Sequence, residues 1–131
     1  MGGGSVSILK NNGNATFSAK KDFLVKSDPP SVYAADLDGD GDFDLAAPND
    51  SGNAVTVLIN KGNADFFSGT PYATEITPVG ITFADLDGDV DLDLAVVNKN
   101  RSTVSIYLNN GNGSFSAGST PSTGLDRKSV V

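Results

Sequence analysis

The sequence predicts an all-β fold of four-stranded antiparallel sheets that follow one another along the chain, about two and a half of them in 131 residues. Three observations predict it. The sequence repeats with a constant period, each period holds four short stretches rich in β-branched and aromatic residues, and no segment shows helical periodicity over ten or more residues. A four-stranded unit of roughly 40–50 residues has the size of one propeller blade.

Two independent landmarks define the repeat. The pattern Val-x-Val/Ile followed by an Asn/Lys-Gly-Asn turn and a phenylalanine begins at Val6, Val55 and Val104, each 49 residues after the previous one. An aspartate-rich stretch begins at Asp36 and again at Asp85, also 49 residues apart. Because no insertion disturbs either spacing, we interpret the period as a structural unit.

The first complete unit shows how four strands follow from the residues. Valine and isoleucine favour strands, Asn-x-Gly-Asn residues tolerate the positive φ of a hairpin, and Pro71 weakens the last strand. The fourth strand is expected to begin at Phe66 and Phe67 and to fade near Pro71. We expect the other three strands at 31–35, 43–47 and 54–59, with a turn at 48–53 and a hairpin at 60–63. The next unit is expected to start at 80–84.

The repeat divides the chain into unequal parts. A repeat region over 1–124 would contain a partial unit at 5–30 and full units at 31–79 and 80–124. Closed propellers need at least roughly four blades, so the chain is expected to be a fragment of a longer protein, to assemble head to tail into a ring or filament, or to stack as a solenoid. Residues 125–131 have no counterpart in the repeats, and we interpret them either as translated adapter sequence or as a polar tail.

Each aspartate-rich stretch places five carboxylates at alternating positions within nine residues, with no basic residue among them. Carboxylates this close cannot all stay ionised cheaply unless protons or a bound cation neutralise them. Hard oxygen ligands in a glycine-containing loop suit Ca²⁺ better than zinc or copper. The sequence therefore predicts two calcium sites, with candidate residues Asp36, Asp38, Asp40, Asp42, Asp44, Asp85, Asp87, Asp89, Asp91 and Asp93.

Composition narrows the class of protein. The net charge is −7, yet ten of the sixteen acids lie in the two loops, so the other six acids face nine Lys and Arg and two Ca²⁺ ions would leave −3. The chain has no cysteine and no histidine, which removes disulfides, thiolate sites and the commonest general base. We expect no nucleic-acid partner, no membrane span and no signal peptide within this sequence.

The sequence argues against three alternatives to a calcium loop. An EF-hand has a Glu at loop position twelve and flanking helices, whereas these loops have Ala47 and Val96 there and flanking strands. A metal-free acidic turn would carry a standing electrostatic cost in both repeats. A carboxylate pair for glycoside hydrolysis would need acids free of metal, and no nucleophile with a partner base accompanies them, so we expect no enzyme activity.

The loop Asp-Leu-Asp-Gly-Asp-Gly-Asp-Phe-Asp-Leu-Ala, followed by Val-x-Val-Leu-x-Asn-x-Gly-Asn-x-x-Phe, resembles the VCBS/FG-GAP repeat family over nearly all of residues 4–120. The resemblance implies a bladed β-propeller architecture, as in integrin α-subunit heads and many secreted bacterial proteins, with calcium in the loop. It implies side-chain ligands at Asp36, Asp38, Asp40 and Asp44 and a backbone carbonyl ligand at Asp42. In the second loop it implies the same roles for Asp85, Asp87, Asp89 and Asp93, with Asp91 by its carbonyl.

One residue departs from the pattern. Val90 stands where the first loop has Gly41. A β-branched residue disfavours positive φ, so the second site is expected to be distorted or weaker, unless its backbone does not need that geometry.

Two functions follow, both extracellular or at the cell surface. The first is a calcium-stabilised structural or adhesion module that joins copies of itself or further repeats of a longer chain. The second is a propeller that binds a glycan or a protein, with Tyr33, Tyr72 and Tyr107 as candidate contact aromatics, although packing is the more ordinary role of each. Four Asn-x-Ser/Thr sequons would mark exposed turns if glycosylated, at Asn14, Asn49, Asn100 and Asn112.

Overall fold

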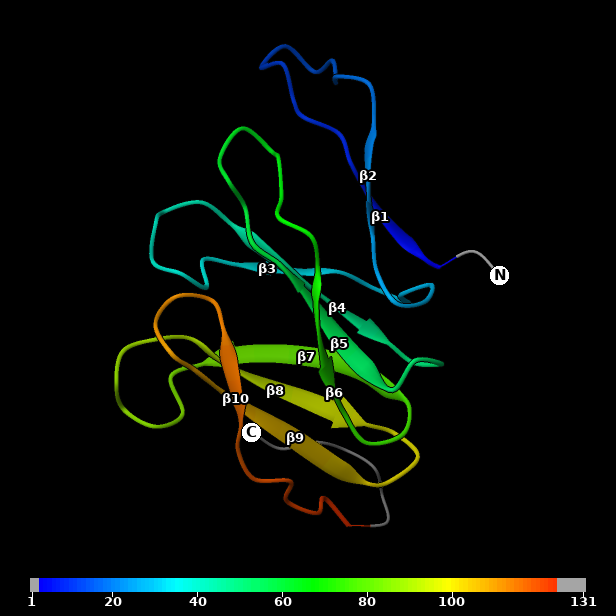
Figure 1. Cartoon of the computed structure of the whole chain (residues 1–131), viewed down its shortest axis with the longest axis vertical. Coiled ribbons are helices and arrows are strands. Elements are labelled where there is room, and N and C mark those ends of the chain that lie inside the picture. Colours follow the sequence, from blue (N-terminus) through cyan, green and yellow to red (C-terminus); the bar gives the residue numbers. More distant parts are fainter. Residues whose placement is uncertain (1–2, 125–131) are drawn as a thin grey trace.

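A computed structural model describes residues 3–124, and its regular structure is entirely β-strand (Figure 1). The predicted tail at 125–131 lies outside the described residues. The strands are β1 (Ser5–Ile8), β2 (Lys21–Leu24), β3 (Tyr33–Ala35), β4 (Asp44–Asn49), β5 (Ala54–Leu58), β6 (Thr70–Ala73), β7 (Pro78–Ala84), β8 (Asp93–Asn98), β9 (Thr103–Asn109) and β10 (Phe115–Ala117).

The strands form two four-stranded antiparallel sheets and one two-stranded sheet. The four-stranded sheets have the orders β3-β4-β5-β6 and β10-β9-β8-β7, and β1 pairs only with β2. The three sheets follow one another along the long axis of the molecule without closing into a ring (Figure 1). The structure thus confirms the predicted all-β fold of propeller-type blades, with β1 and β2 as the third and fourth strands of an incomplete blade.

The repeat is also kept in the strand register. Ala46 pairs with Val57 across β4 and β5, and Ala95 pairs with Ile106 across β8 and β9. Both members of the second pair lie 49 residues after those of the first. Because a one-residue slip would turn every side chain to the opposite face, this shared register gives the two sheets equivalent inner faces.

The core lies between the sheets and not within one of them. Val55 and Val57 of β5 meet Leu94 and Val96 of β8 in the larger apolar cluster. All five residues of β5 are buried, because the other face of its sheet is covered by β1 and β2. Each fully buried valine or leucine contributes roughly 1.5–3 kcal/mol, so blade-to-blade packing dominates stability.

An aromatic contact recurs at both junctions between sheets. The ring centroids of Phe23 and Phe66 lie 5.1 Å apart with an edge-to-face geometry. The rings one repeat later, Tyr72 and Phe115, lie 5.5 Å apart with the same geometry. Because the pair joins the outer strand of one sheet to the hairpin of the next, it sets the spacing between neighbouring blades.

The predicted position of the fourth strand is wrong by several residues. Phe66 forms only an isolated bridge with Asn60, and β6 runs through Pro71 to Ala73 instead of fading there. β6 is the edge strand of its sheet, where a proline can leave its missing N–H facing away from the ladder. β7 likewise begins at Pro78, two residues before the strand expected at Gly80.

Candidate metal centre

The two aspartate loops link the first and second strands of the complete blades. In the first loop, Asp36 accepts hydrogen bonds from the N–H groups of Gly39 (2.8 Å) and Gly41 (2.9 Å). In the second loop, Asp85 accepts the equivalent bonds from Gly88 (2.7 Å) and Val90 (3.0 Å). The first aspartate of each loop thus closes the turn on itself.

The middle aspartates continue the same scheme. Asp38 accepts from the N–H of Asp40 (3.2 Å), and Asp40 accepts from the N–H of Asp42 (2.9 Å). The second loop repeats both bonds at 3.2 and 3.0 Å, among Asp87, Asp89 and Asp91. These middle carboxylates therefore fix the loop backbone with one oxygen each, and the second oxygen of Asp38, Asp40, Asp87 and Asp89 accepts no bond from the loop backbone.

The last aspartate of each loop is fully buried. Asp44 accepts from the N–H of Leu37 (2.7 Å) with one oxygen and from the N–H of Asn60 (2.8 Å) with the other. Asp93 makes the equivalent bonds to Leu86 (2.7 Å) and Asn109 (2.8 Å). Each buried carboxylate thereby ties its loop to the hairpin at the far end of the neighbouring strand.

The loops gather carboxylate oxygens around common points. Oxygens of Asp36, Asp38 and Asp40 lie within 4.8 Å of one another in the first loop. In the second loop the gathered set is Asp85, Asp87 and Asp93. Asp44 and Asp89 lie outside these tightest groups.

The two remaining aspartates point elsewhere. A Cβ placed on Gly62 would lie 3.5 Å from a carboxylate oxygen of Asp42, and one on Gly111 would lie 2.9 Å from that of Asp91. These side chains stand beside the hairpin of their own blade. Their position is compatible with the backbone-carbonyl role that the family resemblance implies for them.

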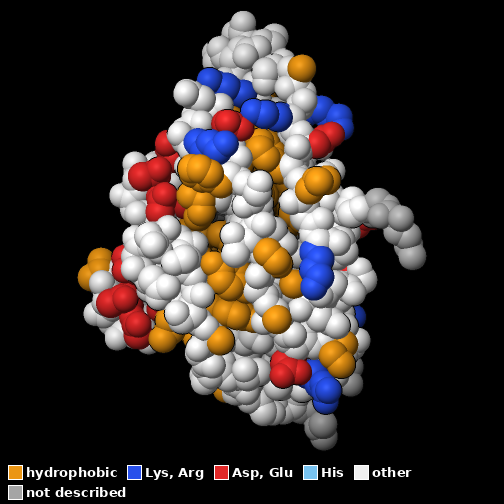
Figure 2. Space-filling model, viewed as in Figure 1, with side chains coloured by type: hydrophobic (Ala, Val, Ile, Leu, Met, Phe, Trp, Pro, Cys, Tyr) orange, Lys and Arg blue, Asp and Glu red, His pale blue; other side chains and the backbone are white. Residues whose placement is uncertain are grey.

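Electrostatics make the loops costly without a cation. Burial, together with neighbouring carboxylates, raises the pKa of Asp38, Asp44 and Asp87 above the usual range. Within residues 3–124, every ion pair of a Lys or Arg involves an acid outside the loops. Figure 2 shows two clusters of acidic side chains on the left edge, over the loops, with other acidic side chains scattered beside basic ones and most Lys and Arg side chains toward the end formed by β1 and β2. An all-oxygen donor set without a cationic partner fits a hard divalent ion.

Val90 keeps the geometry of the glycine that it replaces. Its φ is +82°, against +90° for Gly41, and its N–H makes the same bond to the first aspartate. The expectation of a distorted loop is therefore wrong for the backbone. The strain of a β-branched residue in this conformation stays in the loop, while its side chain is 85% exposed.

Sequence reasoning missed one group of residues, at the contact between the two loops. Asn109 of β9 donates from its side chain to the carbonyl oxygens of Leu37 (2.7 Å) and Leu92 (2.9 Å), one in each loop. Nearby, a Cβ placed on Gly113 would lie 2.5 Å from Cδ1 of Ile59 and 3.6 Å from Cβ of Asp38. The Asn-x-Gly turn that all three repeats share is the available signal in the sequence, and it predicts a hairpin but not this contact between loops.

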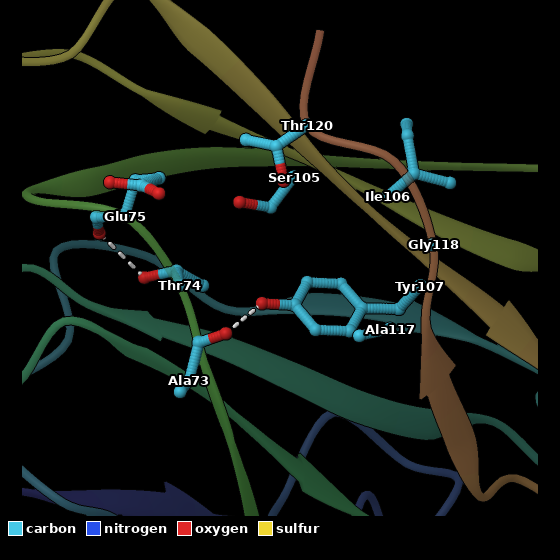
Figure 3. Close-up of a pocket in the computed structure, with 9 residues that line it drawn as sticks. All are labelled: Ala73, Thr74, Glu75, Ser105, Ile106, Tyr107, Ala117, Gly118 and Thr120. Carbon is cyan, nitrogen blue, oxygen red and sulfur yellow. Dashed lines mark hydrogen bonds between the residues drawn. The ribbon is translucent and has the colours of Figure 1, made fainter.

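A small polar cavity lies between the outer strands of the two complete blades (Figure 3). Ser105 and Tyr107 point their hydroxyls from β9 toward the segment that carries Thr74 and Glu75, and Tyr107 donates to the carbonyl of Ala73. The cavity volume is about 150 Å³. The same positions one repeat earlier line a second cavity of about 300 Å³, namely Leu24, Val25, Lys26, Thr56, Gly69 and Pro71.

The candidate contact aromatics take part in packing. Tyr107 is 5% exposed within the larger core, and Tyr33 and Tyr72 pack against that core. Tyr72 also accepts a hydrogen bond from the N–H of Phe115 (3.2 Å). Tyr33 and Tyr72 are half-buried, so a contact role for these two rings stays a prediction.

The four sequons lie in different surroundings. Asn14, Asn100 and Asn112 are exposed, whereas Asn49 is fully buried in β4 and donates to Thr56. Burial makes Asn49 inaccessible to a modifying enzyme in the folded chain. Glycosylation of the other three stays a prediction. Among residues 3–124, no helix is long and apolar enough to cross a membrane.

Comparison with known families agrees with this architecture. The model of the FG-GAP-like repeat matches residues 1–47 and 85–130, together more than half of the chain. No curated protein sequence matches the chain. The matched segments include the half blade, both aspartate loops and strands β8 to β10 of the second complete blade, in the order in which the sheets stack. The chain belongs to the FG-GAP-like repeat family, a family of non-enzymatic, β-propeller-type repeats.

Proposed function

We propose that this repeat module is an extracellular structural or adhesion element that two Ca²⁺ ions stabilise. The supporting observation is the pair of loops in which carboxylate oxygens converge to within 4.8 Å, with no lysine or arginine paired to them among the described residues. The first ion would be held by Asp36, Asp38, Asp40 and Asp44 with the carbonyl of Asp42, and the second by Asp85, Asp87, Asp89 and Asp93 with the carbonyl of Asp91. Millimolar calcium outside cells would keep such loops loaded.

The role of the ion is structural. Bound calcium would supply positive charge that compensates the crowded carboxylates. Stabilising the loop would also stabilise the hairpin, because the Asp44 carboxylate accepts hydrogen bonds both from its own loop and from Asn60 at the start of the hairpin. Two complete sheets do not close a propeller, so we propose that further repeats of a longer chain or further copies supply the missing blades.

Isothermal titration calorimetry of the whole chain with CaCl₂ tests the proposal. We expect two ions per chain and a lower unfolding temperature after EDTA treatment. Asp38→Asn and Asp87→Asn should each remove one ion, whereas Asp65→Asn, outside the loops, should remove none. A folded protein with no heat of calcium binding at millimolar CaCl₂ would reject it.

A second candidate function is recognition of a glycan, and the repeated cavity between blades supports it. A cavity of about 150 Å³ accommodates one six-membered ring, and this one offers hydroxyls and the Glu75 carboxylate. A glycan array distinguishes the two functions. Binding that is lost in Glu75→Gln but kept in Lys26→Gln, the equivalent residue one repeat earlier, would favour recognition through this cavity.

A further inference from the structure

The side chain of Asn109 joins the two aspartate loops directly. It lies at the end of β9, is 4% exposed, and uses its amide nitrogen to bind Leu37 of the first loop and Leu92 of the second. These loops are 49 residues apart in sequence and belong to different sheets. One buried side chain therefore hydrogen-bonds the backbone of both loops.

The orientation of this amide is fixed on every side. Its oxygen accepts from the N–H groups of Gly111 (2.9 Å) and Gly113 (3.2 Å), and its backbone N–H donates to Asp93 (2.8 Å). A flipped amide would set its oxygen against two carbonyls and its nitrogen against two N–H groups. The burial of the group makes such mismatches costly, so the side chain has one arrangement.

The contact falls on the part of the first loop that orients its carboxylates. Leu37 stands between Asp36 and Asp38, its N–H donates to Asp44, and its carbonyl accepts from Asn109. Both ends of this residue are thus held, one by its own loop and the other by the following blade. Leu37 is accordingly only 2% exposed.

The chain contains its own matched comparison. Asn60 occupies the position of Asn109 one repeat earlier and donates to Phe43 (3.0 Å), the counterpart of Leu92. It makes no bond to a preceding loop, since no such loop stands before it in the described structure. Leu86, the counterpart of Leu37, is 40% exposed, and no described side chain donates to its carbonyl.

We propose that Asn109 is a positioning residue that couples the two loops, so that calcium in the second loop raises the calcium affinity of the first. The proposal rests on the proposed calcium function. Binding at the second loop would order Leu92 and Asp93, which hold Asn109, and Asn109 would then hold Leu37 in place before the first ion arrives. Linkage makes the coupling reciprocal, and it requires no change of fold.

Site-resolved titration tests the coupling. In ¹⁵N-resolved NMR spectra of the whole chain, the amides of Gly39 and Gly41 report the first loop and the amide of Gly88 reports the second. Disabling the second loop by Asp87→Asn, with Asn109 intact, should weaken calcium binding at the first loop by about three- to tenfold, the range of one hydrogen bond's net effect. In Asn109→Asp, the same disabling substitution should no longer change the first loop.

The matched variant separates coupling from a local effect. Asn60→Asp should weaken only the first loop directly, whereas Asn109→Asp should weaken both. If Asn109→Asp does not fold by circular dichroism, Asn109→Ser takes its place, and the Asp87→Asn comparison needs no change at Asn109. Equal first-loop affinity in wild type and Asp87→Asn would overturn the coupling while leaving the calcium function intact. Absence of calcium shifts at both loops would overturn the calcium function and the coupling together.

Discussion

The two aspartate loops have the same five acids but different surroundings. Internally they match bond for bond, from the first aspartate to the buried last one. Externally the first loop is covered by the following blade, and Leu37 is buried, while its counterpart Leu86 is exposed. The second loop also contains Val90 at positive φ. The comparison teaches that the local pattern sets loop geometry, whereas the neighbouring blade sets how firmly the loop is held.

Calcium removal should cause the largest loss of stability and the clearest difference between the two loops. At a hundredfold excess over its dissociation constant, each ion contributes about 2.7 kcal/mol to stability. Chelation should therefore lower the unfolding temperature, and hydrogen exchange should accelerate more at Gly88 and Val90 than at Gly39 and Gly41. Equal acceleration at both loops would show that cover by the next blade does not protect the first.

Loss of a buried carboxylate should come next. Asp44→Ala and Asp93→Ala each leave two backbone N–H groups without their acceptor, which costs about 2–4 kcal/mol. Urea unfolding in EDTA measures this without the metal. The two variants should lose similar amounts of stability, because each carboxylate has one buried and one half-buried N–H partner. The exposed Asp50→Ala should stay close to wild type.

Exchange of the residues at positive φ tests the strain in the second loop. Gly41→Val should destabilise the protein by about 1–3 kcal/mol, the usual cost of such a backbone conformation. Val90→Gly should stabilise it by a smaller amount, about 1 kcal/mol, because glycine also raises the entropy of the unfolded chain. Chemical denaturation should therefore show changes of opposite sign in the free energy of unfolding for the two variants. A loss of stability in Val90→Gly would disprove the backbone strain at this position.

The smallest effect should come from a residue that touches neither loop. Tyr107→Phe removes the hydrogen bond to Ala73 and should cost about 1 kcal/mol, without altering the difference between the loops. Burial raises the pKa of the Tyr107 hydroxyl above its usual value of about 10. The contribution of the protonated Tyr107 hydroxyl to the free energy of unfolding is therefore complete below a pH of about 10. It is lost as the pH rises through the pKa that this hydroxyl has in the folded protein. Alkaline unfolding curves should be flatter for the phenylalanine variant.

Much of the fold followed from the sequence because it repeats without insertions. The constant spacing identified the half blade, the two complete blades and the positions of both aspartate loops. The fourth strand was misplaced because Phe66 and Phe67 look more strand-like than Thr70–Ala73, and only the tertiary pairing with β5 places the strand around Pro71. Strand propensity alone does not register a proline at a sheet edge.

The site was predictable within a repeat but not between repeats. Alternating aspartates indicated the loop, and the buried role of Asp44 and Asp93 is in keeping with their places at the strand starts. The bond from Asn109 to Leu37 spans 72 residues and depends on how one blade stacks on another, which no local pattern encodes. The persistence of the loop backbone at Val90 likewise needed the structure, since propensity argued against it.

The close approach at Gly113 gives the repeats an order. Ile59 of the preceding blade occupies the space that a methyl group at this position would need. One repeat earlier the residue is Ala64, and the residue at the place of Ile59 is Lys10. Transposing the two complete units would set the methyl group of Ala64 against Leu108, the counterpart of Ile59, so these blades are not interchangeable modules. The order of the blades along the chain is therefore fixed, because each blade packs against the particular side chains of the blade that precedes it.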